Sequence, residues 1–475
     1  MKLGASVAVY SLATLIARSG QVAMLVVFPY FLSPAQYGVL GLLNAIAAFV
    51  NMLPLEVSQG MARNIADSEG IERAGIIGTA WWFTLGVMLA GGLVMLIAAP
   101  VFSQLLSAGS DITLYLRLAA GFFIATTLVY FTQTLFRWDM RVWDFLWASI
   151  AQAFLPLTMA VAGAFLVTDR LAGTIGGQAA GMVLVLIWSL WRLKGALWAR
   201  FEPVYLRAML AFSLPLVPAS LAILLGVYGS RFVVNEQMSL TDVGLFFFAS
   251  QLATIPSLAI LGVQAALMPH VYSNHANAET PAMVAQVLEI VAAFGLLLTL
   301  GMGLLANAVL TVLGYGQYAA VGPIVTIMAP AFLMQQMYIF GPGFALARRT
   351  MEQMYVAILG GVSSIAFSIA LVKPFGLVGG ALATLCSAAL FLVVWLWRAS
   401  VHYPIPFRPG RLAAACALFA VAAIAGLTAS SGQLPMLIAL LFGFAVGSVL
   451  LGLGHLGTLR QMIGDRLRSM EPPVS

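Results

Sequence analysis

Long apolar stretches, each about 20 residues, alternate with short polar segments along the whole chain, and a helix of that length crosses a bilayer. The apolar residues run continuously instead of alternating with polar ones, which argues against a β-barrel and favours helices. We therefore predict an all-α polytopic membrane protein. Its expected spans, about fourteen in number, cover residues 5–32, 36–60, 75–103, 113–136, 145–167, 174–197, 208–232, 243–268, 283–307, 320–347, 353–372, 376–399, 411–430 and 435–457.

Two short segments interrupt this pattern in the same way. "LSPAQYG" occupies Leu32–Gly38 and "MSLTDVG" occupies Met238–Gly244, and each lies between two apolar stretches. In both, a serine is followed three residues later by Gln36 or Asp242, as in a capping box that starts a helix. Each segment is expected to be a tight non-cytoplasmic turn that begins a new span.

A second pair of similar segments lies near the start of later spans. "GTIGGQAA" occupies Gly173–Ala180 and "GLVGGALA" occupies Gly376–Ala383, again about two hundred residues apart. Small residues at such positions let helix backbones approach closely. Spans 1–6 and 7–12 are thus predicted to be two six-helix bundles of parallel topology, as in some transporters. The expected domains are 1–200, 201–409 and, for two further helices and a tail, 410–475.

Composition supports a membrane protein. Hydrophobic residues make up 62% of the chain and charged residues 8%, whereas a typical soluble domain has about a quarter charged residues. The two cysteines, Cys386 and Cys416, lie in apolar stretches and suggest neither a disulfide framework nor a metal cluster. The N-terminal stretch is too long for a signal peptide and is expected to remain as the first span.

The net charge of +6 is distributed unevenly between alternate loops. Most basic residues fall on one side of the predicted membrane, and the opposite loops contain little beyond Arg170 and Lys373. Under the positive-inside rule, this asymmetry places both termini in the cytoplasm.

Three segments resemble those of a known family. They are "LSPAQYG" after the first span, "LRAMLAFSLPLVPASL" at the opening of the seventh, and "PFGLVGGALAT" leading into the twelfth. Up to Pro409, the chain is similar to polysaccharide exporters of the MOP superfamily, the Wzx-type flippases of lipid-linked oligosaccharides. The resemblance implies two bundles around a central cleft that opens alternately to either side of a bacterial inner membrane. Many members have twelve spans, and fourteen also occurs in the peptidoglycan-precursor branch, so the substrate branch stays open.

Polar side chains within the spans mark a candidate substrate path. Arg18 and Gln21 belong to a run of polar residues spaced by three and four along the first span, so they share one helical face. Arg18 lies near mid-span, where inserting a charge costs roughly 2.5–3.5 kcal/mol, and it is expected to face the bundle interior or an aqueous cavity. Asn44 and Asn51 repeat this pattern on the second span.

Four further residues complete this candidate cleft: Gln133, Arg231, Gln251 and Gln264. Arginine binds phosphate through two parallel hydrogen bonds, so Arg18 and Arg231 at different depths can pass a pyrophosphate or an acidic sugar across the membrane. The amides are expected to bond sugar hydroxyls. Alternatively, the amides bond neighbouring helices, Arg231 snorkels to the outer interface, and Arg18 pairs with a buried carboxylate.

Few acidic residues are available to couple transport to an ion. Glu56, near the inner end of the second span, and Glu289, near that of the ninth, are the candidates, with residence at the interface as the alternative. "GLGHLG" at 452–457 ends a membrane helix and follows no strand, which argues against dinucleotide binding. Because the sequence has no P-loop, zinc pattern or nucleophile elbow, we expect no metal and no cofactor, with an ion gradient or downstream consumption driving transport.

Together these features predict a flippase, not an enzyme, that moves a lipid-linked oligosaccharide or polysaccharide precursor from the cytoplasmic to the periplasmic leaflet. Its expected partners are that substrate, membrane lipids and other polysaccharide-assembly proteins, but not nucleic acid. The nearest alternative is a cation-coupled multidrug exporter of the same superfamily, although Arg18 in place of a carboxylate argues against cationic drugs. A membrane-embedded glycosyltransferase or ligase is the alternative from another class, and it generally requires larger outer loops than this chain has.

Overall fold

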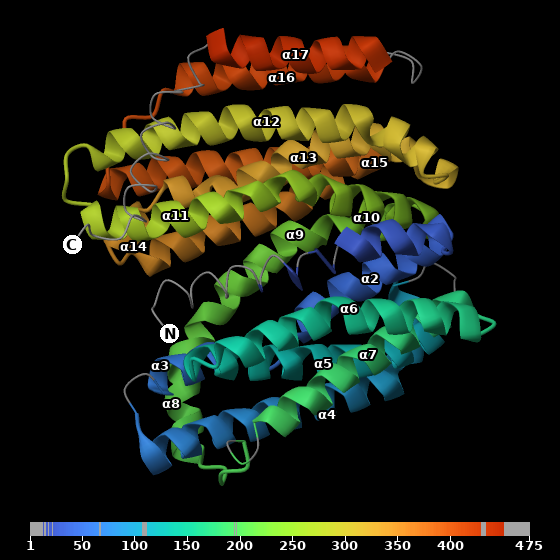
Figure 1. Cartoon of the computed structure of the whole chain (residues 1–475), viewed down its shortest axis with the longest axis vertical. Helices are drawn as coiled ribbons and strands as arrows, with labels where there is room; N and C mark the ends of the chain where they lie inside the picture. The colour runs from blue at the N-terminus through green and yellow to red at the C-terminus, as the bar shows by residue number, and fades with distance from the viewer. Residues whose placement is uncertain are drawn as a thin grey trace, which may run out of the picture. The chain divides into compact units, whose positions relative to one another are not determined.

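The computed structural model describes residues 13, 16–17, 19–20, 22–65, 68–106, 112–193, 195, 197–428 and 434–450. Over these residues the regular structure is helical, with no strand (Figure 1). The predicted all-α polytopic fold is therefore confirmed. Arg18 and Gln21, on the first predicted span, lie outside the described residues.

Each predicted span from the second onward has a helical counterpart. Among the described residues, ten helices are long and apolar enough to cross a membrane, and two shorter apolar helices accompany them. The α-helices are α2 (Pro34–Val50), α3 (Val57–Ile65), α4 (Gly70–Leu106), α5 (Thr113–Trp138), α6 (Val142–Leu166), α7 (Arg170–Arg192), α8 (Pro203–Ser213), α9 (Val217–Gln237), α10 (Leu240–Thr254), α11 (Leu258–Asn274), α12 (Thr280–Val312), α13 (Gly322–Gln336), α14 (Gly343–Leu346), α15 (Thr350–His402), α16 (Pro409–Thr428) and α17 (Leu434–Leu450). Short 3-10 turns join some of them: η1 (Phe28–Tyr30), η2 (Leu214–Leu216), η3 (Ile255–Ser257), η4 (Gly316–Val321) and η5 (Met337–Phe340).

Tertiary contacts divide the chain into two compact units, Met1–Phe248 and Ala249–Ser475, called unit 1 and unit 2 below. The boundary lies within α10, because the first turns of α10 pack closely against α2 in unit 1. The domains expected from the internal repeat (1–200, 201–409 and 410–475) were defined by sequence similarity, whereas units 1 and 2 are defined by tertiary contacts. These three domains remain a prediction.

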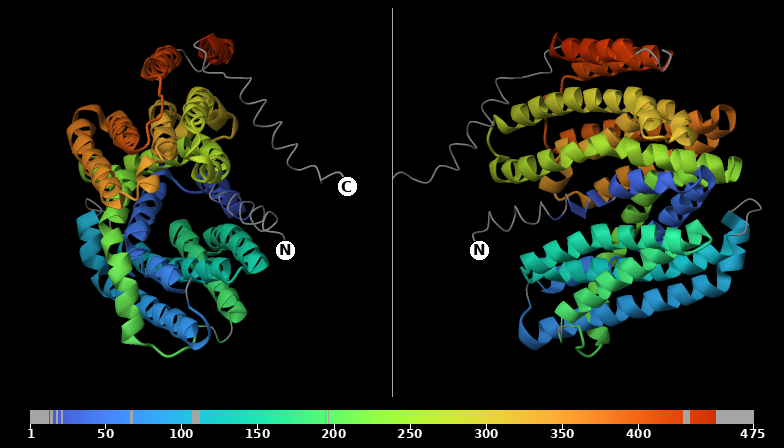
Figure 2. Two further views of the ribbon diagram at one scale, coloured as in Figure 1. Left: turned by 90° about the vertical axis from the view of Figure 1, so that its left-hand side faces the viewer. Right: turned by 45° about the vertical axis from the view of Figure 1, so that its right-hand side comes forward.

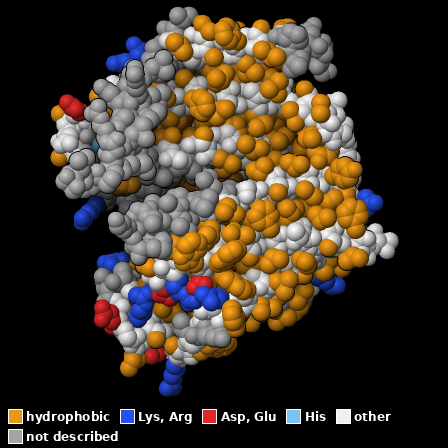
Figure 3. All heavy atoms as spheres, in the orientation of Figure 1, with side chains coloured by type: hydrophobic (Ala, Val, Ile, Leu, Met, Phe, Trp, Pro, Cys, Tyr) orange, Lys and Arg blue, Asp and Glu red, His pale blue; other side chains and the backbone are white. Residues whose placement is uncertain are grey.

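The main bundle of unit 1 consists of α4, α5, α6 and α7, which pack side by side (Figure 2). At one end its core is aromatic, with Trp81 and Phe131 buried and their ring centroids 5.7 Å apart. Large apolar side chains such as Ile97 and Leu105 on α4 remain exposed. Hydrophobic side chains cover much of the surface in view (Figure 3), as expected of a surface that faces lipid.

A network of ion pairs closes one end of this bundle. Asp144, near the start of α6, is buried and accepts hydrogen bonds from Arg141 and Arg192, each at 2.7 Å. Arg141 also donates to the backbone carbonyl of Arg192 at 2.9 Å. Beside them, Arg73 of α4 donates to Asp139 at 2.7 Å. These contacts join α4, α5, α6 and α7 at one end of the bundle.

The second predicted span, 36–60, is not one continuous helix. α2 and α3 are separated by a turn through Asn51–Glu56, in which Leu55 and Glu56 adopt φ angles of 52° and 56°. Pro54 favours the break because it has no amide hydrogen and disfavours the helical conformation at the residue before it. The expectation of an unbroken span was wrong because apolar residues continue through the turn and conceal it from a hydropathy pattern.

The long helix α15 is a pair of antiparallel helices. Within it, Gly376 has φ 58° and ψ −136°, a conformation that glycine adopts without the clash of a Cβ atom. Near the two ends of α15, Glu352 accepts a hydrogen bond from Arg398 at 2.8 Å and lies 3.2 Å from Nε2 of His402. The chain therefore folds back on itself, and its two halves match the eleventh and twelfth predicted spans.

Removing the central carboxylate of the ion-pair network is expected to loosen this end of unit 1. Asp144→Ala leaves Arg141 and Arg192 without their shared acceptor. Because both arginines are partly exposed, we expect the free energy of unfolding to fall by only about 1–2 kcal/mol. The measurement is thermal unfolding in detergent, with Glu279→Ala, which removes an exposed carboxylate, as the control. Equal melting temperatures for the two variants would contradict this role of Asp144.

Candidate functional site

The two repeated turn segments of the sequence have the same local structure. The hydroxyl of Ser33 accepts from the N–H of Gln36 at 3.3 Å, and the N–H of Ser33 donates to Oε1 of Gln36 at 3.0 Å. Ser239 and Asp242 form the same reciprocal pair at 3.2 and 3.1 Å. Both predicted capping boxes are therefore confirmed, and they start α2 and α10.

The helices that these turns start cross each other within unit 1. A Cβ atom on Gly38 of α2 would overlap the carbonyl oxygen of Leu240, and one on Gly244 of α10 would overlap the carbonyl oxygen of Pro34. One offset of 206 residues relates Pro34 to Leu240 and Gly38 to Gly244. The contact of Gly38 with Leu240 is thus equivalent to that of Gly244 with Pro34, with the roles of α2 and α10 exchanged. The crossing therefore has a local pseudo-two-fold symmetry.

Arg231 of α9 lies next to this crossing. Its side chain is buried, with the residue only 4% exposed, so it does not snorkel to an interface. Nη1 of Arg231 donates to Oδ1 of Asn44 on α2 at 3.3 Å. The guanidinium lies 4.8 Å from the ring centroid of Tyr228 and 4.6 Å from that of Phe247, within range of a cation–π interaction.

The structure thus brings together two residues that the sequence singled out, Arg231 and Asn44. It adds Tyr228 and Phe247, which the sequence analysis missed. Tyr228 precedes Arg231 by three residues, so helical spacing alone would have placed it on the same face. The role of Phe247 depends on the crossing of α2 and α10, which no local pattern reveals.

Two other predicted cleft residues bond neighbouring helices. Oδ1 of Asn51 accepts from the hydroxyl of Thr127 at 2.5 Å, which joins the end of α2 to α5. Nε2 of Gln133 donates to Oε1 of Gln152 at 2.7 Å, which joins α5 to α6. These contacts fit the alternative in which the amides hold the bundle together.

In unit 2, Gln251 and Gln264 are half-buried, on α10 and α11. The two acidic candidates differ. Glu289 is only 2% exposed, and its Oε2 lies 3.5 Å from Nη1 of Arg411, so it links α12 to α16. Glu56 is half-buried in the turn between α2 and α3. Neither environment tests the proposed ion coupling.

Unit 2 contains an apolar pocket of about 590 Å³. Its walls come mainly from α11, α12 and α17, and include Ile260, Phe294 and Val449. Ser448 also lines it, and the buried hydroxyl of that serine has no hydrogen-bond partner in the described part of the chain. Among the described residues, no group of three or more His, Cys, Asp or Glu is placed to hold a metal ion.

Replacing Gly38 by alanine is expected to separate α2 from α10. In a helix, Gly→Ala normally stabilises by up to about 1 kcal/mol, but at Gly38 the added methyl group meets the backbone of Leu240. Gly176→Ala on α7 is the matched control, because no atom lies within 4 Å of the position of its added carbon. We expect thermal unfolding in detergent to show a lower melting temperature for Gly38→Ala only. A rise in both variants would contradict the close crossing.

Aqueous thiol reagents should distinguish the two kinds of amide. Asn44 is exposed, whereas Gln133 is 9% exposed and hydrogen-bonded. In a chain whose own exposed Cys386 and Cys416 are replaced by serine, Asn44→Cys is expected to react and Gln133→Cys to stay protected. Labelling of both at equal rates would show that the polar groups around Gln133 are also open to water.

Comparison with solved structures shows the fold to be that of known transporters. It is similar to the lipid II flippase MurJ in an inward closed conformation, with a TM-score of 0.72 and 14% identity over 96% of this chain and 99% of that one. It is also similar to an inward-facing multidrug resistance MATE family transporter of the MOP superfamily (TM-score 0.64, 15% identity, 83% and 95% covered). A MOP superfamily transporter from Pyrococcus furiosus matches with a TM-score of 0.52 and 11% identity over 83% and 96% of the two chains.

None of the curated proteins matches the chain in sequence. A family model does: residues 27–321 match the family described as "Polysaccharide biosynthesis protein". The resemblance inferred from the three sequence segments is thereby confirmed. Since the match covers more than half of its length, the chain belongs to the polysaccharide biosynthesis protein family.

Proposed function

We propose that the chain is a flippase that moves a lipid-linked oligosaccharide or polysaccharide precursor from the cytoplasmic to the periplasmic leaflet by alternating access. Family membership supports a role in polysaccharide assembly. The likeness of the fold to a protein described as a lipid II flippase supports a lipid-linked substrate. The apolar pocket of unit 2 offers space for a hydrocarbon chain.

The observation that carries the proposal is the environment of Arg231. Its buried guanidinium contacts the side-chain amide of Asn44 and the aromatic rings of Tyr228 and Phe247. A cation within a membrane span is costly, and such residues usually serve a substrate or ion path. An anionic head group that displaces the bond to Asn44 would gain bidentate hydrogen bonds, and sugar rings pack well against aromatic faces.

The same proposal covers the features that the sequence predicts but the structure does not test. The chain lies in a bacterial inner membrane with both termini in the cytoplasm, and Arg18, Gln21, Gln251 and Gln264 complete the substrate path. A proton or cation at Glu56 or Glu289 couples transport to a gradient. Other proteins of polysaccharide assembly are the partners that deliver or receive the substrate.

A multidrug exporter is the second candidate, since MATE transporters share the fold. The buried cation at Arg231 disfavours it for cationic drugs, because like charges repel more strongly in a medium of low dielectric constant. Catalysis is not part of the proposal, and the chain acts by transport alone.

The test is flipping by the purified chain in vesicles that contain a fluorescent lipid-linked oligosaccharide on one leaflet. Arg231→Ala is expected to lower the rate about tenfold to hundredfold, the loss expected when a charged hydrogen-bond donor is removed, whereas Arg231→Lys should retain part of the rate. Arg170→Ala, which removes an exposed arginine at the start of α7, is the control. The wild-type chain failing to move the lipid, or Arg231→Ala moving it at full rate, would refute the proposal.

A further inference from the structure

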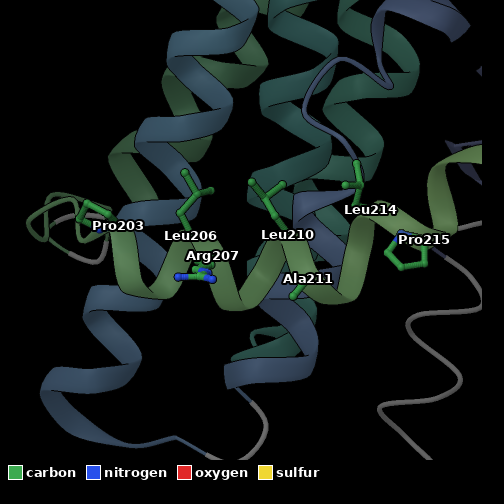
Figure 4. A pocket seen from close by; sticks show the side chains of 7 residues that line it. All are labelled: Pro203, Leu206, Arg207, Leu210, Ala211, Leu214 and Pro215. Atoms are coloured by element: carbon green, nitrogen blue, oxygen red, sulfur yellow. The ribbon is translucent and has the colours of Figure 1, made fainter.

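An open groove of about 640 Å³ follows one side of α8 in unit 1. Figure 4 shows its lining, with the side chains of Leu206, Leu210 and Leu214 pointing to the same side of the helix. Arg207 is the single charged residue in this lining, which is otherwise apolar. The remaining residues that line it are Pro203, Ala211 and Pro215.

The adjoining face of α8 is fixed to the rest of unit 1, and Leu206 and Leu210 are themselves half-buried where they pack against the core of that unit. Met209 and Ser213 are buried, and the ring of Tyr205 packs against Gly75 of α4. Gly60 of α3 lies so close to the carbonyl of Met209 that any side chain at residue 60 would collide with it. The groove is thus a surface on a well-anchored helix, and the helix does not need to move to expose it.

Along the helix axis, Arg207 lies about 6 Å, or one turn, from the first residue of α8, and Leu214 lies about 10 Å beyond Arg207. Trp191, in the last turn of α7, and Trp198, in the segment before α8, are exposed, and tryptophans gather at membrane interfaces. The charge of the groove therefore lies near the head groups, and its leucines extend towards the hydrocarbon. A lipid with an anionic head has the same order of polar and apolar parts.

The helix pair α8–α9 carries a second arginine near its other end. Arg207 and Arg231 are separated by 24 residues, about 36 Å along an uninterrupted helix, against a hydrocarbon core of about 30 Å. One bent span therefore bears an exposed cation near one membrane face and a buried cation near the opposite face.

Resting on the proposed function, we propose that the groove along α8 is the docking site for the lipid phosphate of the transported substrate. Arg207 binds the phosphate at the leaflet from which transport starts, and the hydrocarbon chain lies along Leu206, Leu210 and Leu214. The positive charge of Arg207 complements the phosphate, and the leucines complement the chain. Arg231 then serves the head group near the other face.

The test measures binding of a fluorophore-labelled polyprenyl phosphate to the full-length chain in phosphatidylcholine nanodiscs. Arg207→Gln is expected to weaken binding about three- to tenfold, the range for a partly exposed charge pair. Leu210→Gln should weaken it as well, through the apolar side of the groove. Arg200→Gln removes an exposed arginine that precedes α8 and does not line the groove, and it should bind as wild type does. Equal melting temperatures show that each variant is folded.

Two results would overturn the inference. One is wild-type affinity in both Arg207→Gln and Leu210→Gln. The other is displacement of the probe by phosphatidylglycerol as effectively as by unlabelled polyprenyl phosphate, because the groove would then bind membrane phospholipid. Flipping in vesicles separates this inference from the proposed function. If the wild-type chain and the Arg207→Gln variant move the lipid with the same dependence on substrate concentration, only the docking site is refuted. If the wild-type chain does not move the lipid, the proposed function is refuted, and the binding assay still tests the groove.

Discussion

Direct backbone contact between α2 and α10 is the constraint on which the architecture of unit 1 depends. It requires glycine at residues 38 and 244, because a single methyl group at either place overlaps a carbonyl oxygen. Asn44 follows Gly38 by six residues and Phe247 follows Gly244 by three, and both contact Arg231. The crossing thus sets the distance between the amide and the aromatic ring that hold the buried arginine.

The environment of Arg231 shows how a charge is kept inside an apolar bundle. Aromatic faces attract a cation through their quadrupole, and an amide oxygen accepts one of its hydrogens. The contrast with Asp144 is clear, since that carboxylate lies between two arginines at the end of the bundle. The network around Asp144 links helices to one another, whereas the groups beside Arg231, an amide and two aromatic faces, can also contact a sugar.

The sequence predicted features that depend on local chemistry and missed those that depend on tertiary contacts. Capping boxes at Ser33 and Ser239 were recognisable because they need only residues three apart. The break at Asn51–Glu56 was missed because Met52–Leu55 continue the apolar run of α2, so that a hydropathy pattern passes through the turn.

The same limit applies to the candidate site. A stripe of amides on one helical face does not say whether water or another helix lies opposite, and Asn51 and Gln133 proved to bond α5 and α6. The pairing of Glu352 with His402 was equally invisible, because it joins residues fifty positions apart.

The turn between α2 and α3 has a mechanical consequence. α2 is bound at its start to α10, through Gly38, whereas α3 is bound to α8 through Gly60 and Met209. The turn is itself hydrogen-bonded, for example from the N–H of Leu55 to the carbonyl of Met52, and it marks the point where the attachment of the chain changes from α10 to α8. The helix α8 is therefore linked to the contact between Asn44 and Arg231 by two routes: through α3 and the turn to α2, and through η2 directly to α9.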